Sequence, residues 1–558
     1  MHYLTKKEWL LLVLFMTLVA FPLQYICRSL DMSTLTSWRW VFTGISPAKV
    51  YGFLLITVLL AIPLSIPDLP EKHPLFFLYV SAFLICIPFL NTPEVLLDSA
   101  RYFLQAKYLA RHGIQDFFRG WGSTINPWTD LPIVPFFYGV LFKLFGETKT
   151  VIAVFNALLF SCIPLLTYLT GKLLWDRSTG FIAGLFVLAS PYLLTQVPLM
   201  LVDIHTMFFL LLAVCTFLYA LEQGGYLWLF TAAVAIILAL FSKYSTWPML
   251  GVLGIIVLVR VNSNPQGVLK RSLVVAAMTC CLLGIIFFWK GDVIIQQLQF
   301  LRTYQMEGLK RWEEGYVAAV FFQTHPFVLL TALYGIYRIL RNRDKKILIP
   351  GWFVLLIFLL ELKRVRYLMP LLPFMAITGA YGLREIKFGQ VRRYVAYCCL
   401  GSSLIIALLV YKPFLTRTSM ANLKDAGRFL DTLNDHAVEV YCIPQARSLG
   451  NTSVVVPILD LYTKKILYQE QAWTSTEGHM KAKNVSLRFT WELMQPDYYR
   501  GNMYSGLQIP LVIIASTPVN ELPAIMAEKH PEIQLLKQFN KTSGIYRYQT
   551  FVSVFAPP

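Results

Sequence analysis

The sequence predicts a polytopic α-helical membrane protein that ends in a C-terminal α/β domain. Of its 558 residues, 56% are hydrophobic and 14% are charged, whereas about 25% of the residues of a soluble domain are charged. The mean hydropathy is +0.57, and a soluble enzyme of this size could not bury so much apolar surface. This composition also excludes a disordered chain, a coiled coil and a small disulfide scaffold.

Fourteen apolar stretches predict a membrane domain over residues 1–412. They lie at 9–27, 50–66, 74–91, 131–146, 149–173, 180–194, 204–221, 226–241, 246–261, 272–289, 316–338, 347–361, 367–383 and 394–412. A span needs about 20 residues. The stretch 131–146 is short and contains Pro132 and Pro135, so we predict a half-depth or interfacial helix there. About 13 crossings remain, and the first of them, which lacks a cleavage site, is predicted to stay uncleaved.

Beyond residue 412 the sequence predicts a soluble α/β domain, because apolar runs shorten and turn residues appear. The segment 421–434 has the pattern of an amphipathic helix. Short β-rich runs follow at 438–442, 454–458, 511–514 and 546–551, as expected of strands. The domain 413–558 has an ordinary size for one unit.

The net charge of +18 is interpreted as a topology signal and not as a nucleic-acid signal. Membrane proteins concentrate Lys and Arg in cytoplasmic loops, so no nucleic-acid partner is expected. Basic clusters occur in alternate loops, at 260–271, 338–346 and 384–393, and Lys6, Lys7 and Arg177 join them. The loop 92–148, Asp203, Lys243, the segments 290–315 and 363–366, and the C-terminal domain are then predicted to lie on the outer face.

Ionisable residues at membrane depth are costly and are functional candidates. On the predicted outer side these are Asp98, Asp203, Lys243, Lys363, Arg364 and Arg366. A carboxylate beside several cations suits a negatively charged, lipid-linked substrate, because the cations bind phosphate and the carboxylate accepts a proton. The nine cysteines show no zinc spacing, so no metal cluster and no disulfide framework are predicted.

Five segments between residues 92 and 383 carry a resemblance to a known family. They are the run from Asp98 through Arg101 and Tyr102 to Gly113, the Pro-rich run from Asp130 to Gly146, Ser190-Pro191 followed by Asp203, Ser242-Lys243-Tyr244, and Arg364 to Pro373 with Arg366-Tyr367. In this order they resemble the GT-C glycosyltransferases, in the branch of protein O-mannosyltransferases and aminoarabinose (lipid A) transferases. The sequence departs from that pattern in having Ser99 where the family often has the second acid of an Asp-Glu pair, Asp130 where Lys or His is usual, and two additional spans before the large loop that normally follows the first span.

The resemblance implies a membrane enzyme that transfers a hexosyl or pentosyl group from a polyprenyl-phosphate donor. The acceptor is a protein, a lipid or an envelope glycan, and the expected location is a bacterial inner membrane with the site on the periplasmic side. Asp98 is expected to be the base and Asp203 to position donor or acceptor. The residues expected to bind substrate are Arg101, Tyr102, Lys243, Arg364, Arg366 and Tyr367. No cofactor beyond the lipid-linked donor is predicted, and a divalent metal is an alternative without support in the sequence.

Other interpretations stay open. A transporter or flippase of lipid-linked saccharides is the rival function, although no internal repeat of the kind common in transporters is found. A lipid A or cell-envelope modifying transferase would share the site and differ in acceptor.

Each candidate residue also has a structural interpretation. Asp98 could only pair with Arg101, Asp203 could only cap a span, Lys243 could only snorkel to the headgroups, and Arg364 and Arg366 could contact lipid phosphates in general. The weaker candidates are Glu94, Asp130, His205 and His325, together with Trp121, Trp128 and Trp312 as interface anchors.

Overall fold

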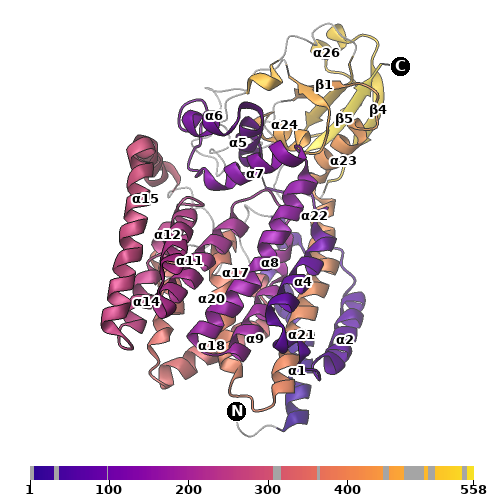
Figure 1. The fold of residues 1–558 in the computed structure, drawn as a ribbon. Coiled ribbons are helices and arrows are strands. Elements are labelled where there is room, and N and C mark those ends of the chain that lie inside the picture. The colour runs from indigo at the N-terminus through magenta and orange to yellow at the C-terminus, as the bar shows by residue number, and fades with distance from the viewer. Residues whose placement is uncertain are drawn as a thin grey trace.

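The computed structural model describes residues 5–29, 37–96, 98–305, 316–360, 365–443, 452–469, 496–500, 509–542 and 549–557. It consists of a helical bundle with a small mixed α/β domain at one end (Figure 1). Each of the fourteen predicted apolar stretches overlaps a helix. The predicted fold class, a polytopic helical membrane protein with a C-terminal α/β domain, is confirmed.

Six of the described helices are long and apolar enough to cross a membrane. They span Lys6–Ser29 (α1), Pro47–Leu64 (α2), Lys149–Leu174 (α8), Asp203–Gln223 (α11), Pro265–Thr303 (α15 and its continuation) and Gly389–Arg417 (α21 to α22). Shorter helices of the bundle are α4 (Pro74–Cys86), α9 (Arg177–Leu188), α12 (Tyr226–Leu240), α14 (Val252–Arg260), α17 (Tyr316–Gln323), α18 (Pro326–Arg341), α19 (Leu348–Leu359) and α20 (Leu372–Leu383).

Small residues let the helices α18 and α20 approach each other closely. A Cβ atom added to Gly335 would lie 2.1 Å from the carbonyl oxygen of Thr378, and one added to Gly382 would lie 2.3 Å from that of Thr331. Lipid tails are as apolar as the side chains of the helices, so the hydrophobic effect does not bring helices together in a bilayer. Their association depends on close backbone packing of this kind. The contact fixes α20, which directly follows the 3-10 helix η5 (Val365–Leu371).

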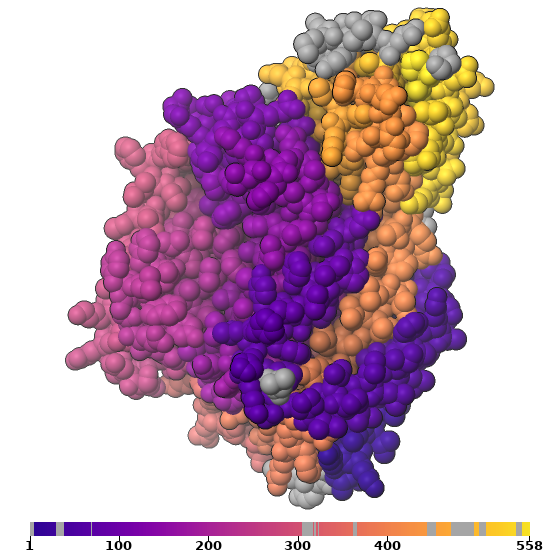
Figure 2. Space-filling model, turned by 45° about the vertical axis from the view of Figure 1, so that its right-hand side comes forward, coloured from indigo at the N-terminus to yellow at the C-terminus, as the bar shows by residue number. Residues whose placement is uncertain are grey.

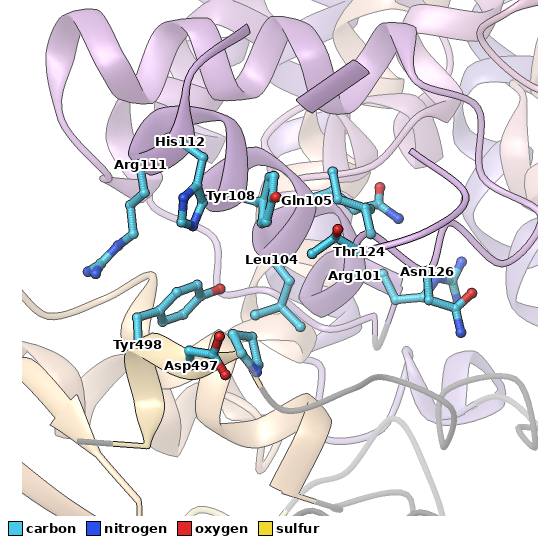
Figure 3. A pocket seen from close by; sticks show the side chains of 12 residues that line it. Arg101, Leu104, Gln105, Tyr108, Arg111, His112, Thr124, Asn126, Asp497 and Tyr498 are labelled. Atoms are coloured by element: carbon cyan, nitrogen blue, oxygen red, sulfur yellow. The ribbon is translucent and has the colours of Figure 1, made fainter. Parts of the chain in front are cut away.

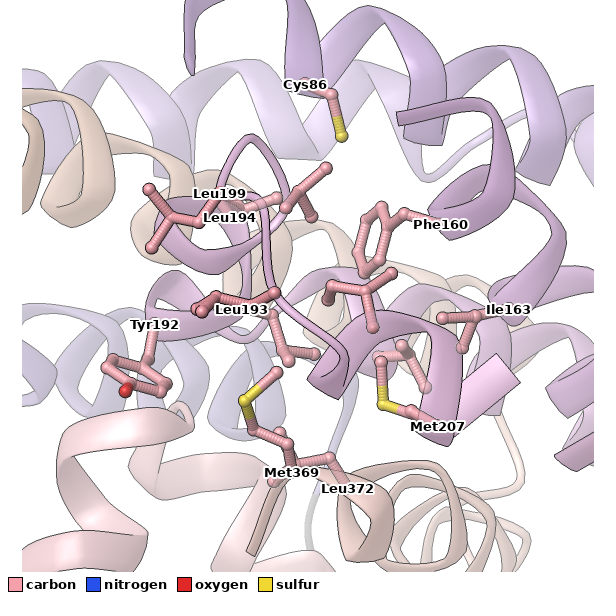
Figure 4. Close-up of a cluster of buried hydrophobic side chains, with 14 of the residues drawn as sticks. Cys86, Phe160, Ile163, Tyr192, Leu193, Leu194, Leu199, Met207, Met369 and Leu372 are labelled. Atoms are coloured by element: carbon pink, nitrogen blue, oxygen red, sulfur yellow. The ribbon is translucent and has the colours of Figure 1, made fainter. Parts of the chain in front are cut away.

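The segment between α9 and α11 is buried in the middle of the bundle. The short helix α10 (Pro191–Gln196) is buried along its whole length. Its side chains Leu193 and Leu194 pack with Phe160 of α8 and Met207 of α11 in one apolar cluster (Figure 4). This packing fixes the start of α11, where Asp203 lies.

Three helices of the first large loop lie across the end of the bundle, next to the C-terminal domain (Figure 1). They are α5 (Asp98–His112), α6 (Ile114–Gly120) and α7 (Ile133–Phe145). The 13 residues of α7 span only about 20 Å, which is shorter than the roughly 30 Å hydrocarbon core of a bilayer. Since α4 of the bundle also has 13 residues, it is the place of α7 across the end of the bundle (Figure 1) that agrees with the prediction that the stretch 131–146 does not cross.

The basic loops meet at the opposite end of the bundle. Arg260 pairs with Glu222 at 2.6 Å, Arg338 with Glu385 at 2.9 Å, and Arg384 with Asp176 at 3.1 Å. Arg260 also donates to the carbonyl of Leu173 at 2.7 Å, near the end of α8. Since α8 has 26 residues, about 39 Å separates this end from the start of α8.

The C-terminal domain contains a five-stranded sheet with the order β2-β1-β3-β5-β4. The strands are β1 (Ala437–Cys442), β2 (Ile466–Tyr468), β3 (Leu511–Ala515), β4 (Gln534–Phe539) and β5 (Phe551–Ala556). β1 is parallel to β2 and β3, and β5 is antiparallel to β3 and β4. The helices are α23 (Ala421–Leu430), α24 (Thr452–Asp460) and α26 (Ala524–Lys529).

One predicted strand is wrong, because residues 454–458 lie within the helix α24. The parallel strands β1 and β2 need a crossover connection, and such a connection is usually a helix. The predictions at 438–442, 511–514 and 421–434 correspond to β1, β3 and α23. The predicted run 546–551 is displaced, since β5 begins at Phe551 and residues 546–548 lie outside the described part of the chain.

Candidate active site

Asp98 is the first residue of α5, and two arginines hold its carboxylate. Its Oδ2 accepts a hydrogen bond from Nη2 of Arg366 at 2.7 Å, and its Oδ1 lies 3.4 Å from Nη1 of Arg101. The Asp98 side chain remains 21% exposed, while those of the two arginines are 8% and 7% exposed. Asp98 is thus the member of this group that a substrate in solution or at the membrane surface can reach.

Arg101 is fixed by a second carboxylate. Its Nε and Nη2 donate to the two oxygens of Asp130 at 2.9 and 3.0 Å, and Gln105 donates to the same carboxylate at 3.2 Å. Burial alone would lower the pKa of Arg101, but the charges of Asp130 and Asp98 outweigh burial and raise it. Arg101 therefore stays charged, and its planar, bidentate pairing holds the guanidinium in one orientation.

Asp203 lies on the other side of Arg366. Its Oδ2 is 3.5 Å from Nε of Arg366, and its Oδ1 accepts a hydrogen bond from Nζ of Lys243 at 2.7 Å. The Lys243 ammonium lies 4.5 Å from the centre of the Tyr367 ring, at a distance suited to a cation–π contact. Lys243 follows α12 and Arg366 lies in η5, so four distant segments meet here.

Carboxylates and cations alternate through the site. The order is Asp130, Arg101, Asp98, Arg366, Asp203 and Lys243. The three positive charges balance the three negative ones. Nη1 of Arg366 is buried and has no hydrogen-bond acceptor among the described residues, so it is a donor that a bound anion can use.

Of the predicted substrate-binding residues, Lys243, Arg366 and Tyr367 are brought together with Asp98 and Asp203. Tyr102 is buried beside Arg101, whose guanidinium carbon lies 5.8 Å from the Tyr102 ring centre. Burial raises the pKa of Tyr102 well above its usual value, so its phenol stays neutral. Arg364, together with Lys363, lies outside the described residues.

Glu94 occupies a fully buried position four residues before Asp98. Its Oε1 accepts hydrogen bonds from Nζ of Lys149 and, at 2.8 Å, from the amide of Met200, and its Oε2 accepts one from Ser99 at 2.6 Å. The amide of Glu94 also contacts the hydroxyl of Tyr462 in the C-terminal domain at 2.6 Å. Glu94 thus ties the start of α5 to α8, to the segment before Asp203 and to the C-terminal domain.

The two candidate histidines, His205 and His325, are buried within the protein. His205 is completely buried, and its ring contacts those of Tyr138 and Phe155 at centroid distances of 5.1 and 5.7 Å. His325 caps α18 by accepting a hydrogen bond from the amide of Phe327 at 3.1 Å.

Two of the three candidate tryptophans lie in the described part of the chain. Trp121 and Trp128 are buried, and Trp312 lies outside the described residues. Within the described ranges, no three His, Cys, Asp or Glu side chains are grouped so that they could hold a metal ion.

The helix α5 also contacts the C-terminal domain directly. Nζ of Lys107 lies 2.6 Å from Oδ2 of Asp460 in α24 and 2.9 Å from Oε2 of Glu147. Figure 2 shows the C-terminal domain resting against the segment that contains α5 to α7. The site is therefore built at a junction between the bundle and this domain.

Sequence reasoning missed several of these contacts. Gln105 follows Arg101 by four residues and so shares its helix face, which is a signal that could have been used. The pairing of Asp130 with Arg101 and that of Lys149 with Glu94 join residues 29 and 55 positions apart. Neither pairing follows from the spacing of charges along one chain.

Part of the chain matches a known protein family. Residues 127–289, which include Asp130, Asp203 and Lys243, match the family described as dolichyl-phosphate-mannose-protein mannosyltransferase. A search of curated proteins found no match.

Two solved structures of ArnT share the fold. ArnT from Cupriavidus metallidurans bound to undecaprenyl phosphate superimposes with a TM-score of 0.54 at 13% identity, over 86% of this chain and 97% of that one. The apo form of ArnT gives 0.53 at 12% identity, over 87% and 98%. The oligosaccharyltransferase AglB from Archaeoglobus fulgidus, in complex with an inhibitory peptide and a dolichol-phosphate, gives 0.43 at 13% identity, over 80% and 70%. The family match over residues 127–289 and the shared fold of ArnT confirm the expected resemblance to GT-C glycosyltransferases of this branch.

Proposed function

We propose that this GT-C glycosyltransferase transfers a sugar from a polyprenyl-phosphate-linked donor to an acceptor, with inversion, on the outer face of the membrane. One observation carries the proposal. Asp98 and Asp203 share the guanidinium of Arg366, and Lys243 lies on the far side of Asp203. A base is thus placed beside cations, as a reaction that releases a phosphate requires.

In the proposed reaction, the acceptor hydroxyl gives its proton to the Asp98 carboxylate as its oxygen attacks the anomeric carbon. The bond between this carbon and the phosphate oxygen breaks, and its electron pair leaves with the polyprenyl phosphate. One base is enough, because a phosphate leaves without needing an acid. A single displacement of this kind inverts the anomeric centre.

Arg366 and Lys243 are assigned to the leaving phosphate. Arg366 offers the donor Nη1, and the Lys243 side chain is 19% exposed. Their positive charges stabilise the negative charge that develops on the phosphate as the sugar departs. Arg101, which is already bidentate to Asp130, orients the Asp98 carboxylate in this proposal, and Asp203 holds Arg366 and Lys243 in place.

The outer face is assigned from the distribution of charge. The loops rich in Arg and Lys meet at the end opposite the site, and such loops are retained in the cytoplasm. A reporter fused after Ser419 should therefore read as extracytoplasmic. A cytoplasmic reading would place the site inside the cell and refute this orientation. A bacterial inner membrane with a periplasmic site remains our proposal for the location.

The acceptor is proposed to be a protein, lipid or envelope glycan. The rival function is transport of a lipid-linked saccharide, in which no covalent bond would change. Functional charges of transporters usually lie near the bilayer midplane, between repeats, whereas Asp98, which pairs with Arg366, begins α5, and α5 lies at the end of the bundle (Figure 1). That position favours the transferase.

The test is an Asp98→Asn variant. We expect mass spectrometry of lipid-linked sugars and envelope glycans to show a product with the wild-type protein and none with the variant, because the amide cannot accept the proton. Asp116→Asn is the matched control, since Asp116 lies in the same loop on α6 and is exposed. The variant should retain the elution profile of the folded protein in detergent. Near-normal product formation by Asp98→Asn would remove Asp98 as the base.

A further inference from the structure

A cavity of about 430 Å³ lies between α5 and the C-terminal domain. Figure 3 shows side chains of α5, among them Leu104 and Tyr108, facing Asp497 and Tyr498 across this space. The turn that contains Thr124 closes another side. This volume is within the range of small-molecule sites, which are usually concave and bordered by two structural units.

The cavity continues from the charged site along one face of α5. Arg101, Gln105, Tyr108 and His112 all line it, and they follow Asp98 at steps of three, four, three and four residues. Such steps place side chains on one face of a helix. Arg101 belongs to both places, because its Nη1 is 3.4 Å from Asp98. A ligand in the cavity therefore has one end next to the proposed base.

The lining combines apolar and hydrogen-bonding groups. Leu104 and Ile125 are buried, while Thr124 and Asn126 are exposed at the rim. The rings of Tyr108 and Tyr498 add flat aromatic surface. Sugar rings present C–H groups on their faces and hydroxyl groups at their edges, so a site of this kind suits them.

The charges of the lining and one unpaired hydrogen-bond acceptor both favour an uncharged ligand that carries hydroxyl groups. Arg101 is neutralised by Asp130, and the charges of Arg111 and Asp497 are opposite, so the lining does not favour a strongly anionic ligand. Oε1 of Gln105 has no hydrogen-bond donor among the described residues, and Gln105 is 4% exposed. A hydroxyl group is a donor that would satisfy it.

We propose that this cavity is the acceptor subsite and that it binds an uncharged saccharide portion of the acceptor. The inference rests on the proposed transferase function. It also gives the C-terminal domain a role, because residues 496–498 form one wall. The domain then selects the acceptor, while the bundle holds the donor.

The experiment uses the full chain in detergent and reducing-end-labelled free oligosaccharides of two to four sugars as probes, with fluorescence polarisation as the readout. Leu104→Trp fills the cavity, and Asn126→Ala removes a polar side chain at the rim together with the hydrogen bond that its Oδ1 accepts from the amide of Trp128 at 3.2 Å. Lys465→Met is the control, because Lys465 lines a neighbouring cavity of about 470 Å³ that shares Arg111 and Tyr498 but not Leu104. Thermal unfolding checks that each variant is folded.

We expect at least one oligosaccharide to bind, and its Kd to rise about tenfold or more in Leu104→Trp and Asn126→Ala but not in Lys465→Met. Absence of binding by every probe, equal binding by all variants, or binding of labelled peptides in place of saccharides would overturn the proposal. Binding is also measured for Asp98→Asn. If Asp98→Asn binds saccharides and still transfers the sugar, the proposed mechanism is refuted and the subsite is not. If Asp98→Asn loses transfer but binding does not depend on the cavity variants, the subsite is refuted and the mechanism is not.

Discussion

Replacement of Glu94 by Gln tests whether one buried ion pair holds the site together. The carboxylate of Glu94 is fully buried, and the Lys149 side chain that it pairs with is 8% exposed. Removal of one partner of such a pair leaves an uncompensated charge and costs about 3–5 kcal/mol. Gln keeps the shape and can still accept from Ser99, so we expect a loss near 3 kcal/mol in the free energy of unfolding.

The double variant Glu94→Gln/Lys149→Met separates the pair from its surroundings. It removes both charges, so it should be more stable than Glu94→Gln alone, because a buried pair replaced as a unit costs little. The exposed pair of Asp68 and Lys72, with side chains 61% and 64% exposed, is the control. Its variant Asp68→Asn should lose less than about 1 kcal/mol.

The assay is denaturant unfolding in a fixed detergent, followed by tryptophan fluorescence, combined with product formation. Glu94 is also bonded to the amide of Met200, three residues before Asp203, so product formation should fall more than the folded fraction does. Two results would refute the reasoning. One is a loss below about 1 kcal/mol in Glu94→Gln. The other is a double variant whose loss equals the sum of the losses measured for Glu94→Gln and for Lys149→Met, each made alone.

Two further predictions concern the site and its junction. Arg366→Lys should lower product formation at least about tenfold, because one ammonium group cannot replace the planar fork that reaches Asp98 and Asp203; Arg384→Lys at the opposite end is the control, and equal activity of the two variants would contradict this. Lys424, whose Nζ contacts the carbonyl of Asn91, has its pKa lowered by burial and by Arg428 from 10.5 to about 8. The unfolded chain then binds a proton up to higher pH than the folded one, so the folded state gains stability as pH rises from about 8 to 10.5. Lys424→Met should abolish this gain in unfolding measurements across that range, whereas Lys464→Met, on an exposed residue, should retain it; an unchanged pH profile in Lys424→Met would refute the assignment.

The membrane part of the fold follows from the sequence because the bilayer imposes simple requirements. A helix in lipid needs a long apolar run, and such runs are visible without tertiary information. The C-terminal domain lies under no such requirement for long apolar runs, so its sequence predicts its elements less well. The run at 454–458 is short and rich in Val, so its periodicity does not separate a strand from a buried helix. Its position between two parallel strands decides that it is helical.

Part of the candidate site can be predicted from the sequence because ionisable residues are rare in so apolar a chain. Asp98, Asp203, Lys243 and Arg366 stand out because ionisable residues are rare in such a chain and share one predicted side. The contacts that orient them depend on residues that charge spacing does not distinguish. Glu94 had the pattern of an ordinary helix-starting acid, and only its burial against Lys149 and Tyr462 reveals its role.

The short helix α7 has a consequence for how a lipid-linked donor arrives. Withdrawal of an acyl or prenyl chain from a bilayer costs about 0.8 kcal/mol per buried CH₂ group, so removal of a long tail costs on the order of tens of kcal/mol. Since α5 and α7 lie across the end of the bundle (Figure 1), we expect the charged site to lie near the depth of the lipid headgroups. A donor can then diffuse sideways within its leaflet and present its phosphate to Arg366 while its tail never leaves the hydrocarbon.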